Sequence, residues 1–120
     1  MVKAIGVDMV KILRITRILQ GTHRDRFLSK VLHKKELEVL ARSNLERVLQ
    51  VVAGSWAAKE AVFKTLDRKD QLRFQFRDWY RYNIEGKPNI SHVDSFSNDR
   101  FLLSISHDGD HLIATVLRLE

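Results

Sequence analysis

Apolar positions alternate near the start of the chain, then recur at helical spacing, and alternate again towards the end. In residues 4–10, Ile5, Val7 and Met9 alternate with small or acidic residues, which predicts a short buried strand. Apolar residues spaced by three or four positions then predict four helical segments. These are residues 12–20, which are amphipathic and basic, residues 24–32, helical in part, residues 34–42 and residues 45–66.

The last of these segments is predicted to be a long central helix, because it has no proline and only one glycine. Gly54 within a helix costs about 1 kcal/mol relative to alanine, so we expect a neighbouring element to pack against the backbone there. Small side chains at four nearby positions would also allow a close approach: Ala53, Ala57, Ala58 and Ala61.

Alternation returns after Leu66 and predicts further strands over residues 72–76, 80–84, 101–106 and 111–119. Asp108 and Gly109 form a hairpin-turn signal between the last two, residues 86–88 indicate another turn, and residues 93–100 are predicted to be a polar loop. The fold class is therefore α/β (α+β), with a long central helix packed on a mostly antiparallel sheet.

Composition indicates a soluble globular chain that forms one domain over residues 1–120. The sequence has 120 residues, no cysteine, one proline, 44% apolar residues and 30% charged residues. The absence of cysteine argues against a disulfide scaffold or a zinc-cysteine site. No stretch is long and apolar enough to span a bilayer, and the N-terminus lacks the build of a signal peptide. The motifs of phosphate-loop nucleotide hydrolases and of nucleophile-elbow hydrolases are also missing.

Positive charge is concentrated in one part of the chain. Residues 11–47 contain ten basic and four acidic side chains, which accounts for the whole net charge of +6. A local positive face attracts an anionic partner, such as nucleic acid, a membrane surface, an acidic protein or a phosphorylated small molecule. The alternative is a solvated helical face without a partner.

Two carboxylates occupy positions where apolar residues are expected. Asp8 lies within an apolar strand, and Glu60 interrupts the apolar row of the central helix between Trp56 and Phe63. If the strand packs on this helix, the two carboxylates could converge and bind Mg²⁺. Alternatively, each forms an ion pair with one of two neighbouring lysines, Lys59 or Lys64.

Two basic residues could complete such a site. Lys64 follows Glu60 by four residues, so the pair is either an ordinary helix salt bridge or a place where Lys64 holds a phosphoryl oxygen. His107 directly precedes the predicted hairpin turn, where it either reaches the rim of a site or is a surface residue.

Four segments together resemble the holo-acyl-carrier-protein synthase family, the small AcpS-type 4'-phosphopantetheinyl transferases. They are Gly6-Val7-Asp8-Met9-Val10 with Arg14-Ile15, the helix segment Ala53-Gly54-Ser55-Trp56-Ala57-Ala58-Lys59-Glu60-Ala61-Val62-Phe63-Lys64, the turn Gly86-Lys87-Pro88, and Leu103-Ser104-Ile105-Ser106-His107. The order and spacing of these segments make the combination specific.

The resemblance implies the 4'-phosphopantetheinyl transferase fold and the family's reaction. In that reaction the phosphopantetheine arm of coenzyme A is transferred to a serine of apo-acyl carrier protein, and adenosine 3',5'-bisphosphate is released. It further implies Mg²⁺ at Asp8 and Glu60, with Glu60 accepting the serine proton directly or through a metal-bound water. Lys64 would stabilise charge on the phosphate. The nucleotide phosphates would be contacted by Lys59, Lys64, His107 and Arg47.

By the same resemblance, the basic segment would bind the acidic acyl carrier protein. The implied docking residues are Arg14, Arg17, Ile18, Arg24 and Phe27. Family members of this size are trimers with active sites between subunits, so a homotrimer is expected, without a membrane or nucleic-acid partner.

The chain also departs from the family pattern at three places. Ser55 stands where many relatives have arginine, so one phosphate contact is expected to be absent or supplied from elsewhere. Lys11 replaces a frequent acid, and residues 66–69 lack the usual glycine-rich turn. These departures leave open a degenerate member that binds acyl carrier protein without catalysis. A separate alternative, based on the positive charge, is a nonenzymatic basic module that binds nucleic acid. The predicted location is the mitochondrial matrix or the cytoplasm.

Overall fold

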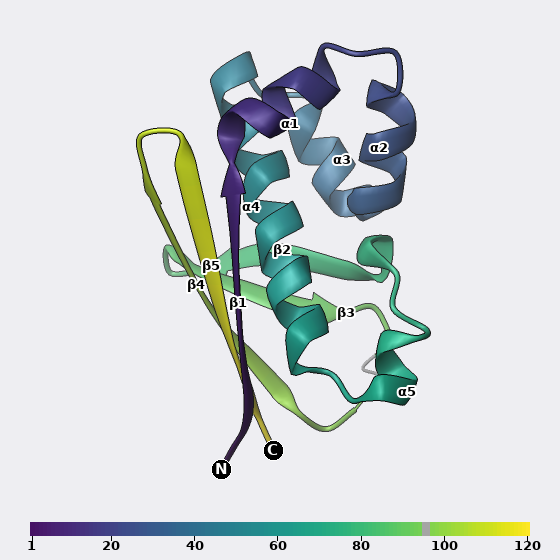
Figure 1. Ribbon diagram of the computed structural model, residues 1–120, viewed down its shortest axis with the longest axis vertical. Helices are drawn as coiled ribbons and strands as arrows, with labels where there is room; N and C mark the ends of the chain where they lie inside the picture. The colour runs from purple at the N-terminus through teal and green to yellow at the C-terminus, as the bar shows by residue number, and fades with distance from the viewer. Residues whose placement is uncertain (95–96) are drawn as a thin grey trace.

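An antiparallel sheet carries one long helix across one of its faces (Figure 1). The computed structural model describes residues 1–94 and 97–120, and within these ranges five strands are ordered β1-β5-β4-β3-β2. The strands are β1 (Val2–Lys11), β2 (Trp79–Ile84), β3 (Lys87–His92), β4 (Arg100–Asp108) and β5 (His111–Leu119). The helices are α1 (Ile12–Leu19), α2 (Arg24–Val31), α3 (Lys34–Leu40), α4 (Leu45–Thr65), α5 (Arg68–Gln71) and the 3₁₀ turn η1 (Phe76–Asp78). The predicted α/β class and the central helix on the sheet are confirmed.

The first strand packs against α4 through its smallest residues. Gly6 and Val10 are buried, whereas Ile5, Val7 and Met9 are 62%, 43% and 63% exposed. The predicted alternation is therefore confirmed, but the apolar residues point away from the helix. A Cβ on Gly6 would overlap the carbonyl oxygen of Ala61, so the strand lies directly on the α4 backbone.

The long helix has the ends and packing that its sequence predicts. Asn44 caps its first turn by accepting a hydrogen bond from the backbone N–H of Arg47 at 2.9 Å. The predicted neighbour at Gly54 is Arg81 of β2, whose guanidinium lies against the glycine. A larger residue at position 54 would occupy this space, so the predicted close approach is confirmed.

Residues 72–76 do not form the predicted strand. They run from a turn after α5 into η1, and their two phenylalanines join an aromatic cluster instead of a ladder. Phe76 stacks on Trp56 of α4 at 5.0 Å, and Phe74 meets Phe63 edge-on at 5.3 Å. Aromatic packing on α4 therefore decides the conformation of this segment.

The remaining strands form two hairpins. Gly109 adopts a positive φ of 61° in the predicted turn between β4 and β5, which confirms that turn. The second turn falls at Glu85 and Gly86, and β3 follows at once, although Pro88 and Asn89 gave that segment no strand signal. Of the predicted loop over residues 93–100, residues 95–96 lie outside the described residues, and residue 100 already belongs to β4.

Candidate active site

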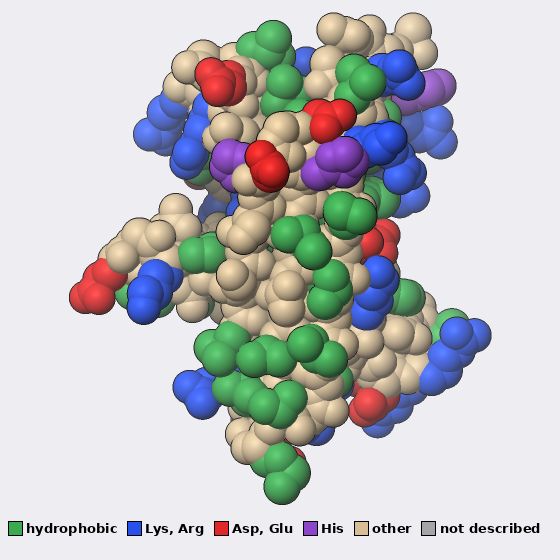
Figure 2. Space-filling model, turned by 60° about the vertical axis from the view of Figure 1, so that its left-hand side comes forward, with side chains coloured by type: hydrophobic (Ala, Val, Ile, Leu, Met, Phe, Trp, Pro, Cys, Tyr) green, Lys and Arg blue, Asp and Glu red, His purple; other side chains and the backbone are tan. Residues whose placement is uncertain are grey.

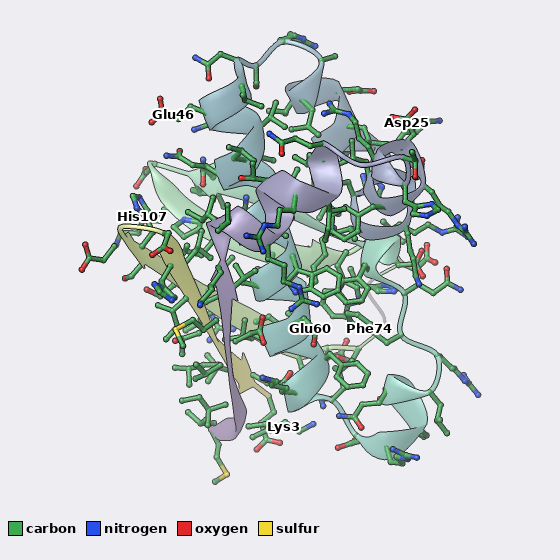
Figure 3. All side chains as sticks on the ribbon, turned by 45° about the horizontal axis from the view of Figure 1, so that its top comes forward. Lys3, Asp25, Glu46, Glu60, Phe74 and His107 are labelled. Carbon is green, nitrogen blue, oxygen red and sulfur yellow. The ribbon has the colours of Figure 1, made fainter. Side chains whose placement is uncertain are left out.

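The close packing of β1 on α4 brings Asp8 to the helix that carries Glu60 and Lys64. Lys64 Nζ donates to the backbone oxygen of Val7 at 2.7 Å and to Asp8 Oδ1 at 3.3 Å. The Asp8 side chain is 17% exposed and the Lys64 side chain is 48% exposed, so this pair lies at the protein surface. Figure 3 shows Glu60 on α4, beside β1. Two carboxylates and one ammonium group therefore share one surface site.

Glu60 experiences the other charges of this site. Partial burial raises its pKa above the ordinary carboxyl value, and the Asp8 carboxylate raises the pKa further, while Lys64 and Arg14 oppose both effects. A carboxylate with a raised pKa is a better proton acceptor than an ordinary one. The arrangement thus places a general-base candidate next to a second carboxylate.

The donor set of this site fits Mg²⁺. In the described part of the chain no group of three or more metal-binding side chains is present. Mg²⁺ nevertheless needs only one or two protein carboxylates, and takes its remaining oxygens from water and substrate phosphates. Asp8 and Glu60 supply such a pair of hard oxygen donors, and a cation between them would relieve the repulsion that raises the Glu60 pKa.

The structure corrects the expectations for Lys59. Its side chain is fully buried, and its Nζ donates to Glu36 Oε1 at 2.6 Å and to the backbone oxygen of Val31 at 2.7 Å. The suggested contact with nucleotide phosphates is wrong for this arrangement, because the ammonium group faces the interior. Its suggested pairing with Asp8 or Glu60 is wrong for the same reason, whereas Asp8 does pair with Lys64.

A second feature is a cleft of about 750 Å³ on the other flank of α4. It lies between α3, α4, β2 and the β4–β5 hairpin, and its lining includes four basic side chains, Lys35, Arg47, Arg81 and His107. The carboxylate in its lining, Glu36, is already neutralised by Lys59. The cleft is therefore suited to an anionic ligand.

Within one chain, the carboxylate site and the cleft lie on different sides of α4. Arg47, Val51 and Gly54 line the cleft at helical spacing, and Glu60 follows Gly54 by six residues, which turns it about 240° around the helix axis. Figure 3 agrees, since His107 lies at the β4–β5 hairpin on the opposite side of β1 from Glu60. Arg47 and His107 thus line one cleft, which the carboxylates of Asp8 and Glu60 do not line.

The predicted docking residues lie on the two short helices at one end of the molecule. Arg14 and Arg17 of α1 and Arg24 of α2 are exposed, and Ile18 is partly exposed beside them. Phe27 of α2 is partly buried and stacks on Trp56 at 5.8 Å. This end therefore presents basic groups with a small apolar component.

Comparison with known proteins gives the family. The model of the 4'-phosphopantetheinyl transferase superfamily matches residues 4–116. The chain belongs to the 4'-phosphopantetheinyl transferase superfamily. The sequence-based resemblance is confirmed, and the enzyme class of this superfamily member is phosphopantetheinyl transferase. The alternative of a nonenzymatic nucleic-acid-binding module is therefore wrong.

Named relatives of this transferase cover almost its whole length. It is 38% identical to the holo-acyl-carrier-protein synthase of Wolbachia pipientis from Culex pipiens, over 98% of this chain and 97% of the relative. It is 30% identical to the enzyme of a Geobacillus species over 98% and 96%. A crystal structure of the Bacillus anthracis synthase in complex with CoA (3',5'-ADP) has a TM-score of 0.82 at 28% identity, and covers 100% of this chain and 98% of that one.

These relatives also bear on location. The two sequence relatives come from bacteria, which gives no support to the mitochondrial matrix. Within residues 1–94 and 97–120, no helix of the transferase has the length and hydropathy that crossing a membrane requires.

Sequence reasoning did not single out Arg81 or Glu36, both of which line the cleft. Glu36 resembles an ordinary surface residue of a short basic helix, and Arg81 alternates with tyrosines in a short strand, where a charged residue is expected to face water. The one usable signal was Gly54, because it predicted a neighbour at that point of α4 without identifying it.

Replacing Glu60 by glutamine should raise the thermal unfolding temperature at neutral pH in metal-free buffer. Above its raised pKa the charged Glu60 opposes folding, and a neutral amide removes that cost. As the pH falls through the raised pKa, wild-type Glu60 takes up a proton, so the advantage of the variant should shrink. Thermal unfolding of both proteins from about pH 4 to about pH 8 measures this difference.

The matched control is Glu46→Gln, an exposed position in the first turn of the same helix, which should show no such gain. Equal unfolding temperatures for wild type and Glu60→Gln at neutral pH would contradict the description of the carboxylate site.

Proposed function

We propose that the protein is a holo-acyl-carrier-protein synthase. It transfers the 4'-phosphopantetheine arm of coenzyme A to a serine of apo-acyl carrier protein and releases adenosine 3',5'-bisphosphate. The observation that carries this proposal is the group of Asp8, Glu60 and Lys64 at the β1–α4 contact, in a superfamily member whose curated relatives are named as that synthase. A Helicobacter pylori synthase crystallised in complex with coenzyme A, 27% identical with a TM-score of 0.73, supports the same donor.

In the proposed mechanism, Asp8 and Glu60 hold Mg²⁺, which when bound neutralises and orients the pyrophosphate of coenzyme A. Glu60 is proposed to accept the proton of the carrier-protein serine. The serine oxygen then forms a bond to the phosphorus next to the pantetheine arm. The pyrophosphate P–O bond breaks, and its electron pair leaves with adenosine 3',5'-bisphosphate. Lys64 stabilises the negative charge that develops on the phosphate.

The cationic cleft is proposed to bind the nucleotide end of coenzyme A. Arg47 and His107 line it from α4 and from the β4–β5 hairpin, in reach of one ligand. The catalytically inactive alternative is disfavoured, because both carboxylates and Lys64 are present at one site.

We also propose that residues 1–120 form one domain, since β1 from one end and β5 from the other pair on a common sheet beneath α4. The bacterial relatives favour the cytoplasm as its location.

Substituting alanine for Asp8 or for Glu60 should abolish transfer without unfolding the protein. Each change removes one of two carboxylates proposed to hold Mg²⁺, and the second also removes the base. Intact-protein mass spectrometry of apo-acyl carrier protein, incubated with coenzyme A with and without Mg²⁺, measures the gain of one phosphopantetheine arm. The matched control is Asp110→Ala, an exposed aspartate at the hairpin turn, which should transfer at the wild-type rate. Wild-type rates for Asp8→Ala would disprove the metal assignment.

We further propose a homotrimer in which one subunit supplies the carboxylates and its neighbour supplies the cationic cleft. The placement of the carboxylates and of the cleft on different sides of α4 supports this, because a neighbouring subunit could bring its cleft to the carboxylates. A second support is the sheet face opposite α4, which exposes Ile5, Val7, Met9, Leu102 and Ile113. Figure 2 shows hydrophobic side chains gathered on this side of the molecule. A monomer seldom leaves so many neighbouring apolar side chains in water.

Mixed assemblies test this arrangement. Asp8→Ala and Arg47→Glu should each be inactive alone, and co-expression of the two should restore activity at sites that combine the intact half of each. Random assembly predicts recovery of about a quarter of the wild-type activity. Co-expression of Asp8→Ala with Glu60→Ala is the control and should recover nothing, since every site then lacks a carboxylate. No recovery in the first mixture would show that each site belongs to a single chain.

The exposed arginines of α1 and α2 are proposed to dock the acidic carrier protein, together with Ile18 and Phe27. Arg14→Glu should therefore raise the KM for carrier protein by roughly tenfold while the KM for coenzyme A changes little. Steady-state kinetics with each substrate varied measures both constants. The control is Arg73→Glu, an exposed arginine beyond α5 on another part of the surface. An effect confined to the KM for coenzyme A would refute the docking assignment.

A further inference from the structure

The floor of the cleft contains a buried network with more positive than negative charge. Glu36 accepts hydrogen bonds from Lys59 Nζ at 2.6 Å, from Ser55 Oγ at 3.0 Å and from the backbone N–H of Arg81 at 3.2 Å. Lys59 has no other charged partner among the described residues, so it and Glu36 neutralise one another. The guanidinium of Arg81 is then the unmatched charge of the network. Buried charges in proteins are normally paired, so this excess calls for an anion.

The guanidinium of Arg81 is held in place by neutral groups only. Its Nε donates to Ser55 Oγ and its Nη2 donates to the backbone oxygen of Val51, both at 3.2 Å. No carboxylate in the described ranges lies within 4.0 Å of it. Two of its five N–H groups are thus used, and the other three have no hydrogen-bond partner among the described residues.

These remaining donors belong to a side chain that lines the cleft. No buried side-chain nitrogen or oxygen is left without a partner among the described residues, so Nη1 of Arg81, which has no partner, is not sealed inside the protein. Burial lowers the pKa of Arg81, Glu36 raises it and Arg47 lowers it, but arginine remains protonated at physiological pH. The cleft therefore presents a fixed cation with free donors.

We propose that Arg81 binds a phosphate group of the nucleotide donor in the cleft, as a guanidinium that Ser55 and the backbone oxygen of Val51 hold in the space left by Gly54. The proposal rests on the proposed function, in which this cleft takes the nucleotide end of coenzyme A. A phosphate group fits better than a single carboxylate, because Lys35, Arg47 and His107 line the same cleft and together suit more than one negative charge. The guanidinium plane also matches two phosphate oxygens at once.

The arrangement explains why positions 54 and 55 are small. A Cβ at position 54 would lie 2.9 Å from Arg81 Nη2 and 3.0 Å from its Nη1. A side chain larger than serine at position 55 would occupy the place of the hydroxyl that accepts from Nε. Position 55 thus supplies no phosphate contact itself, and a guanidinium from β2 reaches the cleft floor instead.

Calorimetric titration with two probes tests the proposal: adenosine 3',5'-bisphosphate and adenosine 5'-phosphate. Arg81→Gln should weaken binding of the bisphosphate by roughly ten- to hundred-fold, the range for loss of a hydrogen bond to a charged group. Arg81→Lys keeps the charge without the fork, so its loss should be smaller. The matched control is Arg77→Gln, an exposed arginine of η1 outside the cleft, which should bind as wild type does.

Gly54→Ala keeps the proposal testable if Arg81→Gln does not fold. Alanine favours the helix and would displace only the end of a flexible side chain, so thermal stability should be retained. Nucleotide affinity should nevertheless fall several-fold, because the guanidinium is moved rather than removed. A purely structural role of Arg81 predicts the reverse, a change in stability without a change in affinity.

Each outcome decides one question. Weaker binding of both probes places Arg81 at the 5'-phosphate, and weaker binding of the bisphosphate alone places it at the 3'-phosphate; either supports the proposal. Wild-type affinity of folded Arg81→Gln and Gly54→Ala for both probes would overturn it while leaving the proposed function intact. If the wild-type protein binds neither probe and transfers nothing, the proposed function and the Arg81 site are both wrong.

Discussion

The direct contact between β1 and α4 is the constraint on which the carboxylate site depends. Gly6 has no side chain, and the carbonyl of Ala61 occupies the space that a Cβ would fill. At this separation the next inward residue of β1, Asp8, reaches the helix face that carries Glu60 and Lys64. A larger residue at position 6 would move the strand outward and take one carboxylate away from the other.

A different interaction organises the cleft. Glu36 caps α3, accepts from Lys59 and Ser55 of α4, and accepts from the backbone of β2, so one buried carboxylate joins three elements. Such a network is stable because every lone pair meets a donor. It also explains why Lys59 and Glu60, adjacent in the sequence, have unrelated roles: successive helix residues point in directions about 100° apart. Lys59 lies in the interior, and Glu60 faces Asp8 and Lys64.

The negative and positive side chains are separated in a way that suits the proposed reaction. The two carboxylates lie apart from the cations of the cleft, which keeps the carboxylates from being neutralised by the groups proposed to bind phosphate. In the proposed trimer the exposed face of β1 would bring these halves together across a subunit contact. The same apolar side chains that alternate along β1 would then be buried by a neighbour rather than by α4.

Hydrophobic spacing was enough to predict the order and type of most elements, because it is a local property of the chain. The sequence also identified the carboxylates as anomalies and led to the superfamily through the segment around Lys59 and Glu60. Three features became visible only in the folded chain: which face of β1 is inside, the aromatic packing of residues 72–76 in place of strand pairing, and the inward turn of Lys59 to Glu36. The contact of Arg81 with Ser55 could not be predicted either, since the fold brings the two together from distant parts of the chain. Spacing reports which side of an element is apolar, whereas the partner of a charge depends on which elements the whole chain packs together.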